Sequence, residues 1–131
     1  EDSEVFYDAI EIMKEHPIEF GAVVHCFCSN LEIANAFLDA NVGIKYFGIG
    51  GAIGDRANEG FIDMVKNMSL EKLLVETDAP YQHFETGDKR LVNSMTLFKV
   101  IDKIAELKGI TPEEVMRVTY KNACEFYGFE E

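Results

Sequence analysis

Apolar residues recur along this chain with two alternating patterns. Spacings of three and four, typical of amphipathic helices, occur over residues 3–15, 30–40, 57–67, 92–108 and 111–128. Short apolar runs typical of buried strands lie between them, at residues 20–27, 42–49 and 72–77. Strands that alternate with helices predict parallel pairing through right-handed crossovers. The pattern therefore predicts an α/β fold with about three parallel strands and flanking helices.

The three predicted strands are apolar on both faces, which is typical of sheets covered by helices on both sides. Three such strands alone would leave two open edges, and open edges are sites of association. We therefore expect residues 1–131 to form a single domain that is part of a larger sheet or barrel. A symmetric homodimer paired through these edges is the partner arrangement that the pattern allows.

Composition narrows the class of protein. The chain has 131 residues, 47% of them hydrophobic, and a formal net charge of −12. This acidity argues against non-specific coating of DNA, although a bound divalent cation can invert the field within a cleft. No apolar run approaches the roughly 18 residues of a membrane span, so we expect no membrane partner. Three cysteines without framework spacing favour a reducing, cytoplasmic location.

The candidate chemistry lies where two predicted strands end. The run 73–81 is apolar until it reaches Glu76 and Asp78, and Pro80 prevents the strand from continuing. Alternation places both carboxylates on one face, and His25 ends the run 20–27 in the equivalent position. Parallel α/β folds bind ligands at this edge, and imidazole with carboxylate suits zinc, manganese or similar divalent ions. The alternatives are a core histidine at position 25 and an Asx-type turn at Asp78.

Two other patterns suggest chemistry less strongly. Cys26 and Cys28 could form a soft-metal pair, but alternation places both thiols on the face opposite His25, which favours ordinary buried cysteines. The glycine-rich stretch 48–54 lacks the lysine and hydroxyl residue of a P-loop. We interpret this stretch as a strand-to-helix turn at the candidate site.

Four segments together resemble a known family. In order, they are residues 24–27 (Val-His-Cys-Phe), 44–49, 74–81 (Leu-Val-Glu-Thr-Asp-Ala-Pro-Tyr) and 119–126. The chain resembles the second half of the TatD-type metal-dependent hydrolases, deoxyribonuclease-like phosphodiesterases on a TIM (β/α) barrel. The resemblance covers nearly the whole chain, and Glu-Thr-Asp-Ala-Pro-Tyr is its most diagnostic segment.

The resemblance implies a role for each candidate residue. His25 would end the sixth barrel strand as a metal ligand, and Asp78 would end the eighth, binding metal and helping to activate the attacking water. The ion would be divalent: zinc, magnesium or manganese. Glu76, one pleat deeper, would orient the ligands. We expect it to accept hydrogen bonds from the barrel mouth or, as the alternative, to pair with Lys45.

Departures from the family pattern limit these expectations. The family's first half supplies a His-x-His pair, a bridging glutamate and a further histidine, which this sequence lacks. In the basic loop after the eighth strand, Thr86 stands where the family usually has arginine. Lys89 and Arg90 remain as possible phosphate contacts, and His83 as a possible substrate contact in the loop.

We therefore predict the carboxyl-terminal part of a metal-dependent hydrolase that cleaves phosphodiesters, with nucleic acid as the parent enzyme's substrate. With two ligand positions, the chain alone should be feeble or inactive, since a catalytic zinc usually has three protein ligands. The first alternative is an inactive remnant that serves as an oligomerising or binding module. The second is a barrel hydrolase that acts on amides or lactones.

Overall fold

A computed structural model describes residues 3–88 and 91–130. Within these residues the chain forms five α-helices, two 3-10 helices and three strands. The helices are α1 (Ser3–Glu15), α2 (Leu31–Asp39), α3 (Glu59–Asn67), α4 (Thr96–Lys108) and α5 (Pro112–Tyr127), with the 3-10 turns η1 (Gly51–Ile53) and η2 (Leu70–Lys72). The strands are β1 (Ala22–Val24), β2 (Ile44–Ile49) and β3 (Leu73–Val75).

The three strands form one parallel sheet in the order β1-β2-β3, which confirms the predicted α/β architecture. Val24 pairs with Phe47 at the carboxyl end of β1, and Val75 pairs with Ile49 at the end of β3. Two further backbone bonds extend the ladders, from the Phe27 amide to the Gly48 carbonyl and from the Glu76 amide to the Ile49 carbonyl. The residues that follow β1 and β3 therefore meet at one edge of the sheet, above the end of β2.

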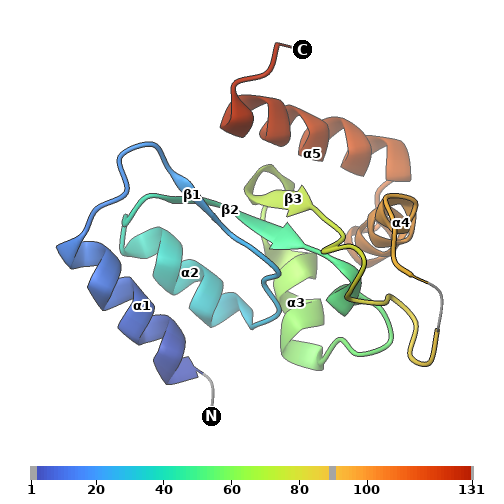
Figure 1. Ribbon diagram of the computed structural model, residues 1–131, viewed down its shortest axis with the longest axis horizontal. Helices are drawn as coiled ribbons and strands as arrows, with labels where there is room; N and C mark the ends of the chain where they lie inside the picture. Colours follow the sequence, from blue (N-terminus) through green and yellow to red (C-terminus); the bar gives the residue numbers. More distant parts are fainter. Residues whose placement is uncertain (1–2, 89–90, 131) are drawn as a thin grey trace.

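The helices lie on two sides of the strands. Figure 1 shows α2 and α3 on one side and α5 on the other, with α1 outside α2. The core lies between α2, α3, α4 and the sheet. Its largest fully buried side chains are all apolar, and they include Phe27, Phe47, Phe61, Ile49 and Leu73. Burial of these side chains supplies the main stabilisation of the fold, at about 1.5–3 kcal/mol for each.

A threonine cap and a terminal glycine define the ends of α5, and α4 begins later than predicted. Thr111 caps α5 by accepting from the Glu114 amide at 3.2 Å, and Gly128 ends the helix in the left-handed region at φ 70°. The Glu114 carboxylate bonds Arg117 at 2.7 Å, on the helix surface. Helix α4 begins at Thr96 instead of residue 92, because Asn93 accepts from the Met95 amide and forms a local turn.

The glycine-rich stretch after β2 forms a turn against the candidate site, as the sequence predicts. At Gly51 and at Gly54 an added Cβ would overlap the carbonyl oxygens of Gln82 and Phe84 respectively. These glycines let the loop after β3 lie directly on the turn after β2. The loop that carries Asp78 is thereby supported by the end of the neighbouring strand.

The described sheet has two open edges. Strand β1 pairs with β2 on one side, β3 pairs with β2 on the other, and no further strand is found in the described part of the chain. None of the described helices combines the length and apolar character required to cross a bilayer.

Candidate metal centre

His25 is presented at the sheet edge by a kink directly after β1. The strand ends at Val24, Cys26 takes a left-handed conformation at φ 50°, and the Phe27 amide returns to the Gly48 carbonyl at 2.9 Å. The imidazole of His25 is 60% exposed. His25 is therefore at the surface, and the alternative of a buried core histidine is wrong.

Glu76 lies across the end of β2 and holds the segment after β1. One carboxylate oxygen, Oε1, accepts from the Cys26 amide at 2.5 Å, and the other, Oε2, lies 2.9 Å from His25 Nδ1. The side chain occupies the space above Gly48, where an added Cβ would overlap Oε2. The expectation that Glu76 accepts hydrogen bonds from groups at this rim is confirmed. The alternative, that Glu76 pairs with Lys45, is wrong. The Lys45 side chain lies beside Gly21, where a Cβ added to the glycine would be 2.6 Å from Lys45 Cε.

Asp78 lies at the same rim as His25 and Glu76, but the backbone that places it there differs from the predicted strand. Strand β3 ends at Val75, and Asp78 has a left-handed backbone at φ 54°, so simple alternation does not place it. The turn is closed by Thr77 Oγ1, which accepts from the Ala79 amide at 3.2 Å, ahead of the cis peptide bond between Ala79 and Pro80. In this turn the Asp78 carboxylate faces His25, with Oδ1 3.4 Å from Nε2.

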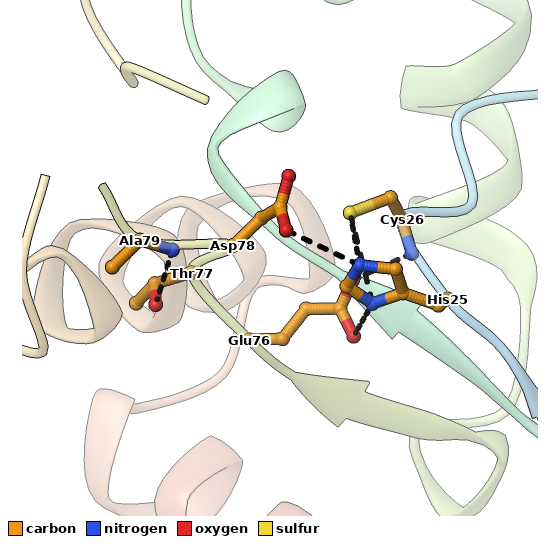
Figure 2. A network of polar contacts seen from close by, with 6 residues as sticks. All are labelled: His25, Cys26, Glu76, Thr77, Asp78 and Ala79. Carbon is orange, nitrogen blue, oxygen red and sulfur yellow. Dashed lines mark hydrogen bonds and ion pairs between the residues drawn. The ribbon is translucent and has the colours of Figure 1, made fainter. Parts of the chain in front are cut away.

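The His25 ring thus lies between two carboxylates, with one on each nitrogen (Figure 2). The hydrogen bond to Glu76 raises the pKa of His25 above its ordinary value, and partial burial opposes this rise; Asp78 adds a smaller rise. An imidazole that donates from Nδ1 to a carboxylate has its Nε2 lone pair available for a metal. Only the Glu76 side of the ring is sheltered, since the Asp78 carboxylate is 39% exposed.

The placement of Cys26 corrects the sequence interpretation. Strand alternation predicts its thiol on the face opposite His25, but Sγ lies 3.1 Å from His25 Nε2. The left-handed backbone at Cys26 breaks the alternation on which that expectation depends. Cys26 is half-buried and Cys28 is exposed, so neither is an ordinary buried cysteine. Burial, followed by the hydrogen bond and the negative charge of Glu76, raises the pKa of the Cys26 thiol to about 12.

The donor atoms at this rim fit a divalent cation. Among the described residues, ligand atoms of His25, Cys26 and Glu76 lie within 4.8 Å of one another, and Asp78 adds a further carboxylate oxygen. Imidazole nitrogen and carboxylate oxygen are ligands for zinc and manganese, and a cation here would offset the two negative charges.

The remaining predicted residues are placed differently. Lys89 and Arg90 lie outside the described residues. His83 is half-buried in the loop after β3, where its carbonyl accepts from Arg56 at 2.8 Å. It lines a pocket of about 170 Å³ formed with Asn93, Thr96, Lys99 and neighbouring residues. No described contact brings His83 to His25 or Asp78.

Sequence reasoning missed Gln82. Its Oε1 atom is buried and, among the described residues, has no hydrogen-bond partner. Its side chain weakly opposes the rise in the pKa of the Cys26 thiol, by hydrogen bonding. Gln82 adopts a left-handed backbone at φ 57°. No local sequence pattern predicts that a glutamine will adopt this conformation. The only signal is the pair of glycines, Gly50 and Gly51, against which Gln82 packs.

Known proteins provide an independent comparison. Residues 2–128 match the family model described as TatD related DNase. The chain is 34% identical over 119 residues to the uncharacterized metal-dependent hydrolase YabD of Bacillus subtilis, covering 88% of this chain and 45% of YabD. It is 31% identical over 121 residues to the uncharacterized metal-dependent hydrolase YcfH of Escherichia coli, covering 92% of this chain and 44% of YcfH. The chain therefore spans less than half the length of the curated relatives it matches.

A solved structure agrees on the fold. The crystal structure of YJJV, a TatD homologue from Escherichia coli, superposes with a TM-score of 0.81 at 23% identity, covering 92% of this chain and 46% of that one. The described strands and helices thus have the α/β architecture of about half of a TatD-type TIM barrel. From the match over nearly all of its residues, this chain belongs to the TatD related DNase family.

Proposed function

We propose that this chain forms the carboxyl-terminal half of a metal-dependent hydrolase that cleaves phosphodiester bonds, with DNA as the substrate class. The observation that supports it most directly is the arrangement of one imidazole with Glu76 on Nδ1 and Asp78 on Nε2, at the carboxyl edge of a parallel sheet. The family's description as TatD related DNase supports the substrate class.

His25 and Asp78 are the residues that would hold the ion. Glu76 fixes the His25 ring by accepting from Nδ1, so that Nε2 faces Asp78 and the solvent. When bound, a divalent ion polarises a phosphoryl oxygen and makes water more acidic. His25 and Asp78 supply two of the three or more protein ligands that a catalytic site needs, so other strands must complete it.

Asp78 also has a free oxygen for proton transfer. Figure 2 shows that one carboxylate oxygen points to His25 and the other points away from the ring. The second oxygen can accept the proton of the water that attacks phosphorus, while the P–O bond to the leaving alcohol breaks. His83, Lys89 and Arg90, which follow Asp78 in the sequence, are proposed to contact the substrate.

The surface charge makes the cation essential to this function. With a net charge of −12, the chain as a whole repels a polyanionic substrate. Two carboxylates at the site add to that repulsion until a divalent ion is bound. We expect the metal to be required for substrate binding as well as for the chemical step.

The test joins this chain to the amino-terminal strands of a relative. The chain is joined behind the amino-terminal half of Bacillus subtilis YabD, in place of the 45% of YabD that it matches. The chimera should hydrolyse bis(p-nitrophenyl) phosphate and nick supercoiled DNA with Mn²⁺ or Zn²⁺, and EDTA should abolish both activities. Asp78→Asn should reduce the rate by at least 100-fold, since it removes a ligand and a proton acceptor.

The control is His16→Ala, at an exposed histidine after α1. A folded chimera whose rate is unchanged by Asp78→Asn would contradict the proposal. Hydrolysis of amides or lactones instead of phosphodiesters, lost in Asp78→Asn, would retain the metal site and reject the substrate class.

A further inference from the structure

The thiol of Cys26 lies close to both ring nitrogens of His25. The proposed function assigns no role to this thiol. Cys26 Sγ lies 3.1 Å from Nε2 and 3.7 Å from Nδ1. Figure 2 shows the sulfur directed at the ring, on the side where Asp78 also approaches. Three kinds of metal ligand (nitrogen, sulfur and carboxylate oxygen) therefore gather around one point.

These distances suit a shared ion. Nitrogen and sulfur ligands of one tetrahedral zinc, at about 2.0–2.3 Å from the metal, lie about 3.5 Å apart. The observed separation from Sγ to Nε2, 3.1 Å, is close to that value. Sγ also lies 3.7 Å from Nδ1, so the thiol sits beside the ring, and a rotation of the Cys26 side chain toward the Nε2 lone pair would bring both atoms into one coordination sphere.

We propose that Cys26 is a ligand of the same divalent ion that His25 binds, which makes the site selective for a thiophilic metal such as zinc over magnesium. The inference rests on the proposed function only for the location of the ion. On binding, the S–H bond breaks, a metal–sulfur bond forms, and the proton passes to solvent. A thiolate ligand favours zinc strongly, whereas magnesium prefers oxygen.

The test titrates the metal-free chain with Co²⁺ alone and follows its absorption spectrum. Bound cobalt gives d–d bands in the visible range, and a cobalt–thiolate bond adds a charge-transfer band in the near ultraviolet. We expect both in the unmodified chain. Cys26→Ser should abolish the near-ultraviolet band and weaken Zn²⁺ binding by at least tenfold, the lower end of the range for loss of a residue that supports a metal site.

Cys28→Ser is the matched control. This thiol is two residues away and exposed, and it is not among the clustered ligand atoms, so its spectrum and affinity should equal those of the unmodified chain. Visible bands without the near-ultraviolet band, or a near-ultraviolet band that survives Cys26→Ser, would overturn the inference and leave the His25–Asp78 site in place. No cobalt binding at all would overturn both.

Discussion

At the scale of single residues, the two carboxylates around His25 differ in their surroundings and therefore in their effects. The Glu76 side chain is 20% exposed and lies 2.9 Å from Nδ1, whereas Asp78 is 39% exposed and lies 3.4 Å from Nε2. A closer partner in a less solvated position interacts more strongly. Glu76 therefore fixes the ring, and Asp78 shares its accessible side.

The titration of His25 in the metal-free protein tests this difference. Its pKa is raised mainly by the hydrogen bond to Glu76 and less by Asp78. Glu76→Gln should therefore lower the pKa of His25 more than Asp78→Asn does. NMR titration of the ring protons of His25 measures both shifts, and a larger drop in Asp78→Asn would contradict the geometry.

The same shift fixes the sign of the pH dependence of stability. A histidine whose pKa is higher in the folded state stabilises that state fully below its unfolded pKa of about 6.5. This contribution is lost as the pH rises through the raised pKa of His25. The free energy of unfolding of the metal-free chain should fall over that window, and less so in Glu76→Gln.

Gly48 controls the position of Glu76. An added Cβ would overlap the Glu76 carboxylate, so Gly48→Ala should displace it from both His25 and the Cys26 amide. We expect the pKa of His25 to fall and the affinity for Zn²⁺, measured by calorimetry, to drop about 10- to 100-fold. Gly60→Ala, where a Cβ would meet nothing closer than 3.3 Å, is the control and should keep the affinity.

At the scale of single residues, the sequence was sufficient to predict which side chains meet at the site. It was not sufficient to predict the backbone conformations that place them. Strand ends and parallel order were sufficient to bring His25, Glu76 and Asp78 to one rim. The positive φ angles of Cys26 and Gln82 belong to residue types that usually avoid this region, whereas aspartate, as at Asp78, tolerates it. Cys26 was misplaced for this reason, and Gln82 was missed.

At the scale of elements, α5 supports the strand that leads to the site. Asn122 is 5% exposed and donates to the carbonyls of Leu70 and Leu73, at 3.0 and 2.8 Å. These carbonyls belong to η2 and to the first residue of β3. The family-like segment 119–126 therefore has a structural role: it fixes the start of the strand whose end presents Glu76 and Asp78.

Removal of this side chain should destabilise the whole fold. Asn122→Leu loses both hydrogen bonds and leaves two carbonyls without these donors, at a cost of about 2–4 kcal/mol. Urea unfolding followed by circular dichroism measures the change. Asn67→Ala, at an exposed asparagine that bonds Asp63 within its own helix, should cost less than about 1 kcal/mol. Equal costs for the two variants would contradict the supporting role of Asn122.

Helix positions were predicted more closely than strand lengths. Helix α1 has the predicted bounds 3–15, whereas the strands predicted at 20–27 and 72–77 are regular only at Ala22–Val24 and Leu73–Val75. The residues that follow these strands, His25 to Phe27 and Glu76 to Ala79, form the turns at the site and do not continue the regular strands. Hydrophobic runs predict burial and do not mark where the hydrogen-bond ladder ends.

At the scale of the whole molecule, the outer side of β3 is apolar as well as unpaired in the described sheet. A groove of about 400 Å³ lies beside this strand, lined by Leu74 and Val75 of β3, Ile101 of α4, and Met116 and neighbouring residues of α5. In a closed barrel this edge would be covered by a neighbouring strand. In the separate chain it is exposed to other molecules.

We therefore expect the chain to self-associate through this side. Sedimentation velocity should show a dimer whose fraction rises with concentration over the micromolar range. Met116→Lys introduces a charge into the groove and should shift the chain to monomer. Ile12→Lys, on the exposed face of α1, should leave the association unchanged. A monomer at every concentration would reject the homodimer.

The central claim is that His25 and Asp78 bind one divalent ion, with Glu76 holding the ring. Its most direct test is a long-range ¹H–¹⁵N spectrum of the histidine rings during titration with Zn²⁺. We predict that His25 Nε2 shifts to a metal-bound value at one equivalent, that Nδ1 keeps its proton, and that Asp78→Asn weakens the binding. A His25 ring that is unaffected by zinc, or that binds it equally well in Asp78→Asn, would contradict the account.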